Sequence, residues 1–449
     1  MSTMSLPVLS VAPAAAAPKK KTQVGNYFVA NYPPFGSWTQ EGIRDLDRVL
    51  SEPANPGTDL GLYAHIPFCR KRCHFCYFRV YTDKSSSEVR GYLDTLVAEL
   101  GRYAAKPVFE GRRPSFVYFG GGTPSYLSPD QFTYLVREMQ RHMPWTDAKE
   151  IAIEAEPGTL TEKKLKTFRD LGVTRLSLGI EHFDDHILGV NGRAHRSKEI
   201  ARAYGYAREI GIPQINIDLI AGMLEETDEK WQDAVAKAIA LEPDSVTIYQ
   251  MEIPYNTTIY KQMQAEGSLV APVADWDTKR AWVSYAFDEF KKAGYSVVAA
   301  TTVVKDPKEP FLYRKGLFDG TDILSVGVSS FGHIKGVNYQ NQHDFHPYLD
   351  AVNAGGLPVY RAYALDERER YIREFALQMK NGRVETAPFV QKYGVDPRER
   401  FAEPLERLRR MGVLVDTGDA LGVNREGLMQ VDRLLYEFFL PEHRNGRYA

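Results

Sequence analysis

Cysteine is scarce in this chain, whose 449 residues include only three. All three fall in one short loop, as Cys69, Cys73 and Cys76, and an odd number of neighbouring cysteines cannot form a disulfide framework. We therefore expect a reducing, cytoplasmic setting. We expect no membrane span, because no apolar run approaches the roughly eighteen residues that a transmembrane helix needs. The lysines of the opening MSTMSLPVLSVAPAAAAPKKK follow its apolar stretch, which is the reverse of a secretory signal.

The chain also lacks an excess of charge of either sign, since its formal net charge is −2. Nucleic-acid binding requires a basic face, so we do not expect nucleic acid as a partner. A length of 449 residues with 43% apolar residues supports one large domain with appendages, or two to three domains. Residues 1–22 are rich in Ala and Pro, which predicts a disordered tail.

The three cysteines have the spacing CxxxCxxC in HIPFCRKRCHFCYF, directly after a short apolar strand. Three soft thiolates in one tight loop favour a metal cluster with one corner left open, because structural zinc takes four ligands and four-iron clusters usually take four cysteines. The alternative is a zinc site that His65 or His74 completes. The basic run RKR after the first cysteine is either a solvated loop or a device that lowers thiolate pKa and attracts an anionic cofactor or reductant.

Short β-branched runs alternate with longer amphipathic stretches such as SEVRGYLDTLVAELGRYA, which predicts repeated βα units around a parallel sheet. Six such units in about 200 residues predict an α/β fold with a partial (β/α)6 barrel rather than a closed eight-stranded one. Catalytic groups gather at the carboxyl ends of parallel strands, where the cysteine loop and the segments GGGTP, EAEP, GIEH and IDLI all lie. The predicted strands are 60–65, 115–119, 150–154, 175–179, 214–218 and 245–250.

We predict four regions along the chain. After the tail, residues 23–56 form a segment that packs on the site, and residues 57–345 form the barrel, whose core is closed by GTDILSVGVSSFGHIKGVNYQNQ. Residues 346–449 turn helical and end in a pattern of helices and short strands that resembles a winged helix. Because this region mixes Arg with Asp and Glu, we favour a lid or substrate clamp over DNA binding.

The cysteine spacing, the preceding strand and Phe75 before the last cysteine resemble the radical S-adenosylmethionine (SAM) enzymes. Residues of about 57–440 resemble the oxygen-independent coproporphyrinogen III oxidase (HemN-like) family, as does the leading segment NYFVANYPPFGSW. The resemblance implies a [4Fe-4S] cluster, SAM, a tetrapyrrole-like small-molecule substrate, a one-electron donor such as flavodoxin or ferredoxin, and a monomer. It is carried by YAHIPFC, YFGGGTPSYL, IAIEAEPGTL, RLSLGIEHFD, NGRAH, INIDLIAGM and DILSVGVSS.

The resemblance also implies roles for single residues. The three cysteines would bind three irons of the cluster, and Tyr63 and Phe75 would line the SAM pocket. Backbone and hydroxyl groups of the GGGTP element would contact SAM, and Glu154 would accept a hydrogen bond from a ribose hydroxyl. The residues of that element are Gly121, Gly122 and Thr123.

Further residues are expected around a second SAM molecule, a feature of this family. Arg193 and Asp218 would contact it, and Phe331 joins the cofactor-binding group. Glu181 and Glu252 stand where the family has glutamine and alanine. Two added carboxylates would favour a cationic sulfonium or accept a proton beside it, so we count Glu181 with Tyr63 as catalytic candidates.

Three functions remain open at this stage. Oxidative decarboxylation of a propionate-bearing tetrapyrrole comes first, because the similarity runs from end to end. Methyl transfer in the manner of class C radical SAM methylases comes second, because Phe78 replaces a further family cysteine and the two glutamates are added. Heme handling comes third, with His333 and His65 as conceivable axial ligands.

Overall fold

A computed structural model describes residues 28–55, 57–266, 273–444 and 446. The predicted disordered tail, residues 1–22, lies outside the described residues, and so do the first residues of the predicted N-terminal segment. Among the described residues, no helix is long and apolar enough to cross a bilayer.

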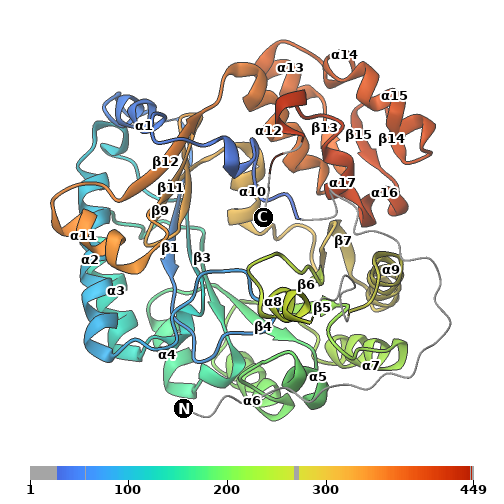
Figure 1. Cartoon of the computed structure of the whole chain (residues 1–449), viewed down its shortest axis with the longest axis horizontal. Coiled ribbons are helices and arrows are strands. Elements are labelled where there is room, and N and C mark those ends of the chain that lie inside the picture. The colour runs from blue at the N-terminus through green and yellow to red at the C-terminus, as the bar shows by residue number, and fades with distance from the viewer. Residues whose placement is uncertain (1–27, 56, 267–272, 445, 447–449) are drawn as a thin grey trace.

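Seven strands run parallel in the order β9-β1-β2-β3-β4-β5-β6 and form the centre of the fold (Figure 1). Each of the six predicted strands is present, extended by up to three residues, and Asp322–Val326 of the predicted closing stretch adds β9 beside β1. The register is in step, because Tyr63 pairs with both Tyr118 and Ser325. The bounds are β1 Leu60–Ile66, β2 Phe116–Gly121, β3 Glu150–Ala155, β4 Arg175–Glu181, β5 Gln214–Ala221, β6 Ser245–Gln250 and β9 Asp322–Val326.

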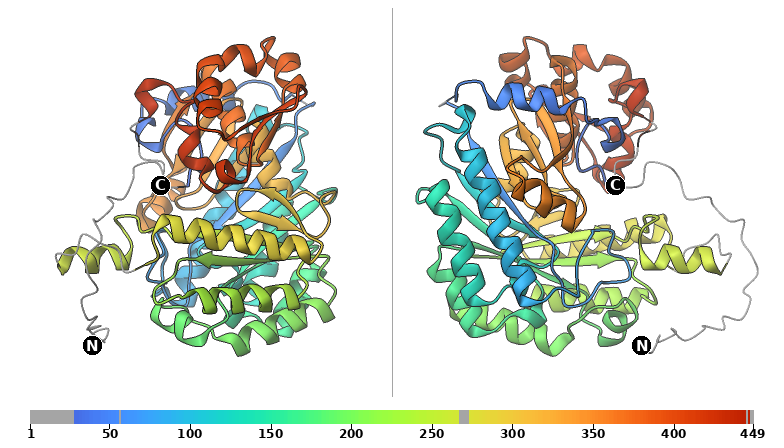
Figure 2. Two further views of the ribbon diagram at one scale, coloured as in Figure 1. Left: turned by 90° about the vertical axis from the view of Figure 1, so that its right-hand side faces the viewer. Right: turned by 60° about the vertical axis from the view of Figure 1, so that its left-hand side comes forward.

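Helices cover the outer face of these strands, as Figures 1 and 2 show. All of them except α6 begin at a side chain that accepts a hydrogen bond from the first turn: Ser85 and Ser128, for example, form capping boxes on α2 and α3, and Thr161 and Thr227 cap α4 and α7. The apolar stripe of each helix packs against strand side chains such as Leu62 that are fully buried. The helices are α2 Ser86–Ala104, α3 Pro129–His142, α4 Glu162–Asp170, α5 Asp185–Val190, α6 Ser197–Glu209, α7 Asp228–Ala240, α8 Thr258–Ala265 and α9 Trp276–Lys292.

Antiparallel strands extend the sheet at both edges, so that among the described residues it has 12 strands. One extension, β12, lies beyond residue 346 and pairs with β11, so the barrel sheet continues past the predicted domain boundary. The connection between the two strands contains α11, and an antiparallel partner can be added at the edge without a crossover to the other side of the sheet. The added elements are β7 Ser296–Ala299, β8 Thr302–Val304, α10 Leu312–Asp319, β10 Phe331–Ile334, β11 Val337–Asn341, α11 Phe345–Asn353 and β12 Val359–Ala364.

The C-terminal region, red in Figure 1, has helices around a small antiparallel sheet of order β13-β15-β14. Short helices, a β14–β15 hairpin and further helices follow one another as the winged-helix prediction expects, and β13 is an added strand. The elements are α12 Glu367–Met379, β13 Arg383–Glu385, α13 Ala387–Tyr393, α14 Pro397–Arg400, α15 Ala402–Arg410, β14 Leu414–Asp416, β15 Ala420–Val423, α16 Arg425–Met429 and α17 Val431–Leu435.

The described N-terminal residues bridge the two regions. The Phe28 amide donates to Glu252 after β6, and the Val29 amide donates to Asp432 of α17. Lys380 binds the Val29 carbonyl at 2.9 Å, and α1 (Ile43–Leu50) then packs against β12. This segment therefore connects the carboxyl end of β6 to the C-terminal region.

Candidate iron–sulfur and cofactor site

The three cysteines lie on the loop that leaves the carboxyl end of β1. Reciprocal hydrogen bonds close this loop, from the Cys69 amide to the Tyr81 carbonyl and from the Tyr81 amide to the Pro67 carbonyl, at 3.1 and 2.8 Å. Arg72 supports its far side, because one guanidinium nitrogen donates to the carbonyls of Cys76 and Asn256. The thiols are therefore held by backbone contacts, and all are free and partly exposed.

Two of the thiols have polar partners. Thr123 Oγ1 lies 3.2 Å from the Cys69 sulfur, and Arg193 Nη1 lies 3.2 Å from the Cys73 sulfur. Burial nevertheless raises the pKa of Cys69 to about 11 and that of Cys76 to about 12, so the thiolates need a bound cation to form readily. The donor set of three soft sulfurs therefore fits a metal cluster.

A single zinc ion fits this loop less well. Among the described residues, no group of three His, Cys, Asp or Glu side chains converges to hold one metal ion. The two candidate fourth ligands have hydrogen bonds at Nδ1, His74 with the Val190 carbonyl and His65 with the Tyr63 hydroxyl, so only Nε2 could bind zinc, and neither histidine belongs to a described group that could hold one ion. In a four-iron cluster each thiolate takes a different corner, which a loop with spread sulfurs can supply.

The glycine run at the end of β2 lies directly against the cysteine loop. Gly121 has φ +117°, and a Cβ there would lie 2.7 Å from the His65 ring, while a Cβ on Gly122 would lie 3.1 Å from the Cys69 sulfur. Only glycine permits this approach. The two amides have protein acceptors, because Gly121 donates to Glu154 and Gly122 to the Ile66 carbonyl, so the predicted backbone contact with SAM falls to their other atoms and to the Thr123 hydroxyl.

Glu154 ends β3 beside the glycine run. Its carboxylate accepts hydrogen bonds from the Tyr118 hydroxyl at 2.6 Å and from the Gly121 amide at 3.0 Å. Burial raises its pKa to about 7 despite these bonds. A carboxyl group that is poised between its two protonation states at a strand end can accept a hydrogen bond from a ligand hydroxyl, which is the role predicted for it.

Two more carboxyl groups lie on β4 and β5: Glu181 is the last residue of β4, and Asp218 lies three residues before the end of β5. Glu181 follows a bulge in β4 and has φ +67°, an unusual conformation for a residue other than glycine and one that gathers at functional sites. Asp218 accepts hydrogen bonds from Ser177 and Asn216, and burial, with Glu181 and Glu154 nearby, raises its pKa to about 8.

Arg193 is the cation that faces these acids. Its guanidinium lies 3.5 Å from Glu181, donates to the Gly179 carbonyl and reaches Cys73. One buried guanidinium against three buried carboxyl groups leaves a negative potential, which suits a sulfonium or ammonium group.

The family model described as "Radical SAM superfamily" matches residues 63–238, a span that holds the three cysteines, the glycine run and the three acids. Residues 63–238 are a radical SAM domain. This match confirms the predicted [4Fe-4S] cluster and SAM as the cofactors.

Comparisons over most of the length place the chain among HemN-like radical SAM proteins. It is 28% identical over 397 residues to the oxygen-independent coproporphyrinogen III oxidase of Helicobacter pylori, which covers 84% of this chain and 85% of that protein. It is also 28% identical over 378 residues to heme chaperone HemW of Bacillus subtilis, with 81% and 95% covered. The structure of coproporphyrinogen III oxidase (HemN) from Escherichia coli matches with a TM-score of 0.79 at 24% identity, covering 92% and 96% of the two chains, which confirms the fold.

Three predicted site residues of this radical SAM protein have other surroundings. Glu252 accepts a hydrogen bond from the Phe28 amide at 2.6 Å, and burial raises its pKa to about 8, so it holds the N-terminal segment. The Phe331 ring packs 4.5 Å from the Phe35 ring, within that segment's aromatic contacts. Phe75 packs against a small apolar cluster beside the site, formed by Ile187, Ile220, Met223 and Met251.

Some residues of the site were missed by sequence reasoning. Tyr118 and Tyr313 stack against each other at 4.5 Å and against Tyr63 at 5.8 Å, which builds an aromatic wall inside the barrel. Below Glu154 and Asp218, polar side chains line a cavity of about 80 Å³. These cavity-lining residues could have been recognised in the sequence as polar residues at alternate positions of otherwise apolar strands. Examples are Ser177, Asn216 and Thr247.

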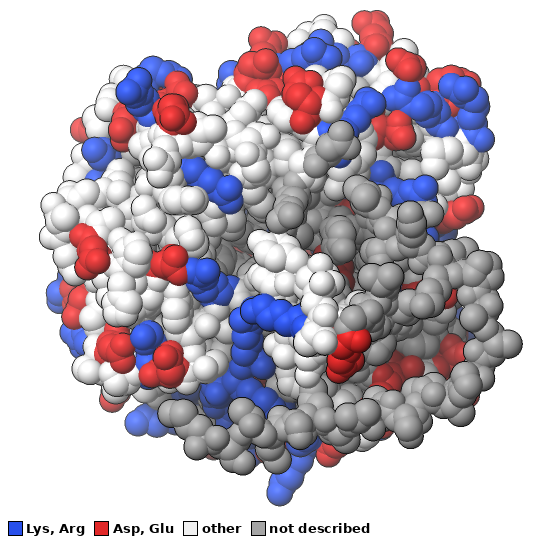
Figure 3. All heavy atoms as spheres, viewed as in Figure 1, with Lys and Arg blue, Asp and Glu red and all other residues white. Residues whose placement is uncertain are grey.

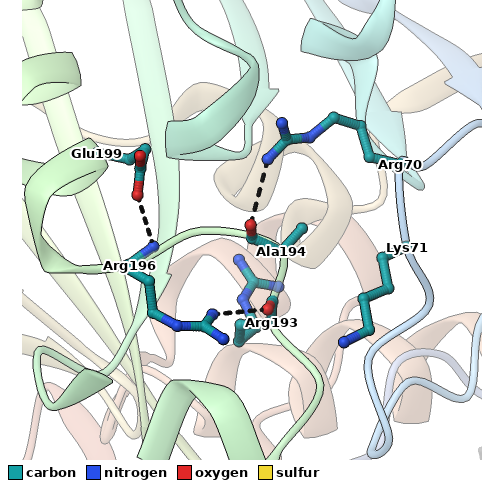
Figure 4. Close-up of a pocket in the computed structure, with 6 residues that line it drawn as sticks. All are labelled: Arg70, Lys71, Arg193, Ala194, Arg196 and Glu199. Atoms are coloured by element: carbon teal, nitrogen blue, oxygen red, sulfur yellow. Dashed lines mark hydrogen bonds between the residues drawn. The ribbon is translucent and has the colours of Figure 1, made fainter. Parts of the chain in front are cut away.

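A wider cavity of about 490 Å³ lies outside the barrel mouth and is lined mainly by cations (Figure 4). Its residues come from the RKR run and from the loop before α6, both of which the sequence displays as clusters of basic residues. They are Arg70, Lys71, Arg193, Ala194, Arg196 and Glu199.

Proposed function

We propose that this radical SAM protein cleaves SAM reductively and uses it to oxidise and decarboxylate a propionate-bearing tetrapyrrole, as coproporphyrinogen III oxidases do. The observation that carries the proposal is the similarity to oxygen-independent coproporphyrinogen III oxidases over 84–86% of the chain. The site chemistry supports it, because three thiols, a glycine run and buried acids meet at the barrel mouth.

The chain's own residues would bind and orient the cofactors. Cys69, Cys73 and Cys76 would hold the cluster, which supplies one electron for the cleavage of SAM when it is bound. Glu154 would accept a hydrogen bond from a hydroxyl group of the bound nucleoside. Tyr63, which stacks on Tyr118, would close the pocket below that nucleoside. These contacts fix the geometry and exclude water.

Glu181, Asp218 and Arg193 would receive the second SAM molecule. The two acids would face its sulfonium or ammonium group, and the guanidinium would pair with its carboxylate. A protonated Asp218 loses its proton to gain the attraction of that cation, so binding of a second SAM would strengthen as the pH rises through about 8.

The test is an anaerobic incubation of the cluster-loaded protein with SAM, a reductant and coproporphyrinogen III. Protoporphyrinogen, methionine and 5′-deoxyadenosine are the expected products, measured by liquid chromatography and mass spectrometry. Cys76→Ala is the matched control, and we expect it to yield none of the three products above background. An intact cluster that yields no protoporphyrinogen contradicts the substrate, and S-adenosylhomocysteine among the products supports methyl transfer instead.

Heme handling is the second candidate, because the chain also matches heme chaperones, one of them across 95% of its length. The two conceivable axial ligands are poorly placed for an incoming heme, since His65 and His333 are both buried. Titration with hemin separates the candidates. A stoichiometric Soret shift that His65→Ala or His333→Ala removes supports heme handling, and no shift rules against it.

A further inference from the structure

Apart from Arg193, the residues of the basic cavity outside the barrel mouth have no part in the proposed chemistry. Arg70 and Lys71 reach it from the cysteine loop, and Arg196 reaches it from the opposite loop (Figure 4). Glu199 is the acid among its lining residues, and its carboxylate already accepts from the Arg196 amide. The Arg70 guanidinium stays 42% exposed although it pairs with Glu156, and Lys71 is exposed. The cavity is therefore open and positively charged.

This charge is local. The whole chain has a formal net charge of −2, so a basic patch is not a general property of the surface. On the face seen in Figure 3, Lys and Arg side chains form a continuous band in the lower centre, where Figure 1 shows the loop that follows β1. A concentrated patch on a nearly neutral molecule directs an oppositely charged partner to one orientation.

The cavity also lies against the cluster ligands. Arg193 lines it and places Nη1 3.2 Å from the Cys73 sulfur, so one side chain separates the cavity from a thiol. Arg70 and Lys71 belong to the same loop, between Cys69 and Cys73. A redox group that is seated here would lie close to the cluster without entering the pocket that holds SAM.

We propose that the surface of Arg70, Lys71 and Arg196 is the docking site of an acidic one-electron carrier protein. The inference rests on the proposed function, which needs a reductant for the cluster. In the step the carrier loses one electron and the cluster gains it, and no bond is made or broken. The open mouth and its exposed cations favour a protein surface with clustered carboxylates over a buried small molecule.

The first test measures binding, which requires no turnover. An acidic flavodoxin is titrated into the cluster-loaded protein by calorimetry at low and at physiological ionic strength. We expect Lys71→Glu to weaken the affinity about tenfold at low salt and to flatten its salt dependence, with Lys71→Gln between the variant and the wild type. Equal affinities for the wild type and Lys71→Glu would overturn the proposal.

The control is Lys308→Glu. Lys308 is exposed on the loop after β8, and Val304 of that strand pairs with Ser245 at the amino end of β6, so the loop leaves the barrel opposite the cysteines. Its reversal changes the net charge by the same amount. Flavodoxin affinity should match the wild type, and a loss equal to that of Lys71→Glu would mean that net charge rather than this surface governs binding.

A second measurement separates this inference from the proposed function. Reduction of the cluster is followed by its visible absorbance in stopped flow, with no SAM or substrate present. We expect Lys71→Glu to slow reduction by reduced flavodoxin about tenfold, while reduction by the methyl viologen radical cation keeps its rate. If flavodoxin reduces both proteins at one rate, the docking site is wrong. A missing tetrapyrrole activity leaves this result unaffected, because neither substrate nor SAM takes part.

Discussion

The barrel mouth and the C-terminal region differ in where their acidic side chains lie and in how those side chains are paired. At the mouth, Glu154, Glu181 and Asp218 are buried together, and burial raises the pKa of each. In the C-terminal region, Arg383 and Arg398 pair with acids on the exposed side, the buried ammonium of Lys380 has Asp432 as its partner, and a cluster of rings is buried. That cluster has centroid distances of 4.6–5.8 Å and is formed by Tyr371, Phe375, Phe389, Phe401 and Phe438.

The contrast shows that the barrel mouth is the less stable of the two arrangements. Buried acids with one guanidinium cost free energy, whereas buried rings and solvated ion pairs do not. The mouth also contains Glu181 with its positive φ and glycines against the cysteine loop. Costs of this kind persist where binding repays them, which supports the mouth as the functional site.

The largest effect should come from the cysteine loop. Cys73→Ala removes one of three thiols, and two thiolates with SAM cannot hold four irons, so the iron content of reconstituted protein should fall close to zero and SAM cleavage with it. Iron and sulfide assays check this. Ser125→Ala, outside the thiol set, should keep its iron. A variant Cys73→Ala that retains four irons would contradict the assignment of the loop.

The next largest effect should come from Arg193, whose guanidinium faces the acids at the mouth. Arg193→Met leaves Glu181 buried without its cation, and we expect the free energy of unfolding to fall by about 3–5 kcal/mol. The double variant Arg193→Met/Glu181→Gln should regain part of that loss, because it removes the stranded charge. Urea denaturation of the SAM-free protein measures both. An additive double variant would mean that the two residues do not interact.

The pH dependence of stability should separate the two regions. The folded pKa of Asp218, about 8, lies above its ordinary value of 3.8, so the folded state binds the proton more tightly. Its contribution is fully present below pH 3.8 and is lost as the pH rises through about 8, with a slope of up to about 1.4 kcal/mol per pH unit. Asp218→Asn should flatten that fall.

Asp416 is the matched control in the C-terminal region. A hydrogen bond from Arg398 lowers its pKa, so its contribution is present above the ordinary value of 3.8 and is lost as the pH falls below that value. Asp416→Asn should therefore change stability in the opposite direction along the pH axis. Denaturation series from about pH 2 to about pH 9 decide the point, and identical profiles for the two variants would remove the contrast between mouth and surface.

The smallest effect should follow from an exposed pair. The side chains of Arg383 and Asp419 are 48% and 67% exposed, so Arg383→Gln should change the free energy of unfolding by about 1 kcal/mol or less. Arg112→Gln is the comparison, because Arg112 and Asp322 form a buried 2.8 Å pair with 4% and 10% exposure, and its loss should be several times larger. A large effect of Arg383→Gln in denaturation would break the contrast.

Much of the barrel was predictable, because parallel strands buried on both faces give apolar runs that turn signals delimit. The six predicted strands and the helix over 86–104 agree with the structure for that reason. The edge strands β7, β8 and β12 were not predicted, since short edge strands carry little periodicity and draw their stability from pairing, whereas β10 and β11 lie in the stretch predicted to close the core. The boundary at residue 346 stays a prediction, and β12 beyond it pairs with β11.

The site was predictable in its chemistry and less so in its partners. The strand-end rule led to Glu154, Glu181 and Asp218, which the structure brings near one another. Sequence could not show that Glu252 faces Phe28, because that contact joins residues 224 apart in the chain. Nor could it show that Arg193 and the RKR run meet, since only the fold brings α6's leading loop beside the cysteines.

The contacts of the bridging N-terminal segment can form only late in translation. The Tyr32 hydroxyl lies 2.8 Å from His443 Nδ1, a contact between residues 411 apart, and Val29 meets Asp432. A growing chain offers neither acceptor until translation is almost over, whereas β1 to β6 can pair earlier. The cysteine loop is therefore synthesised well before the contacts of residues 29–32 can form. These residues are made early in translation but are among the last to reach their folded positions.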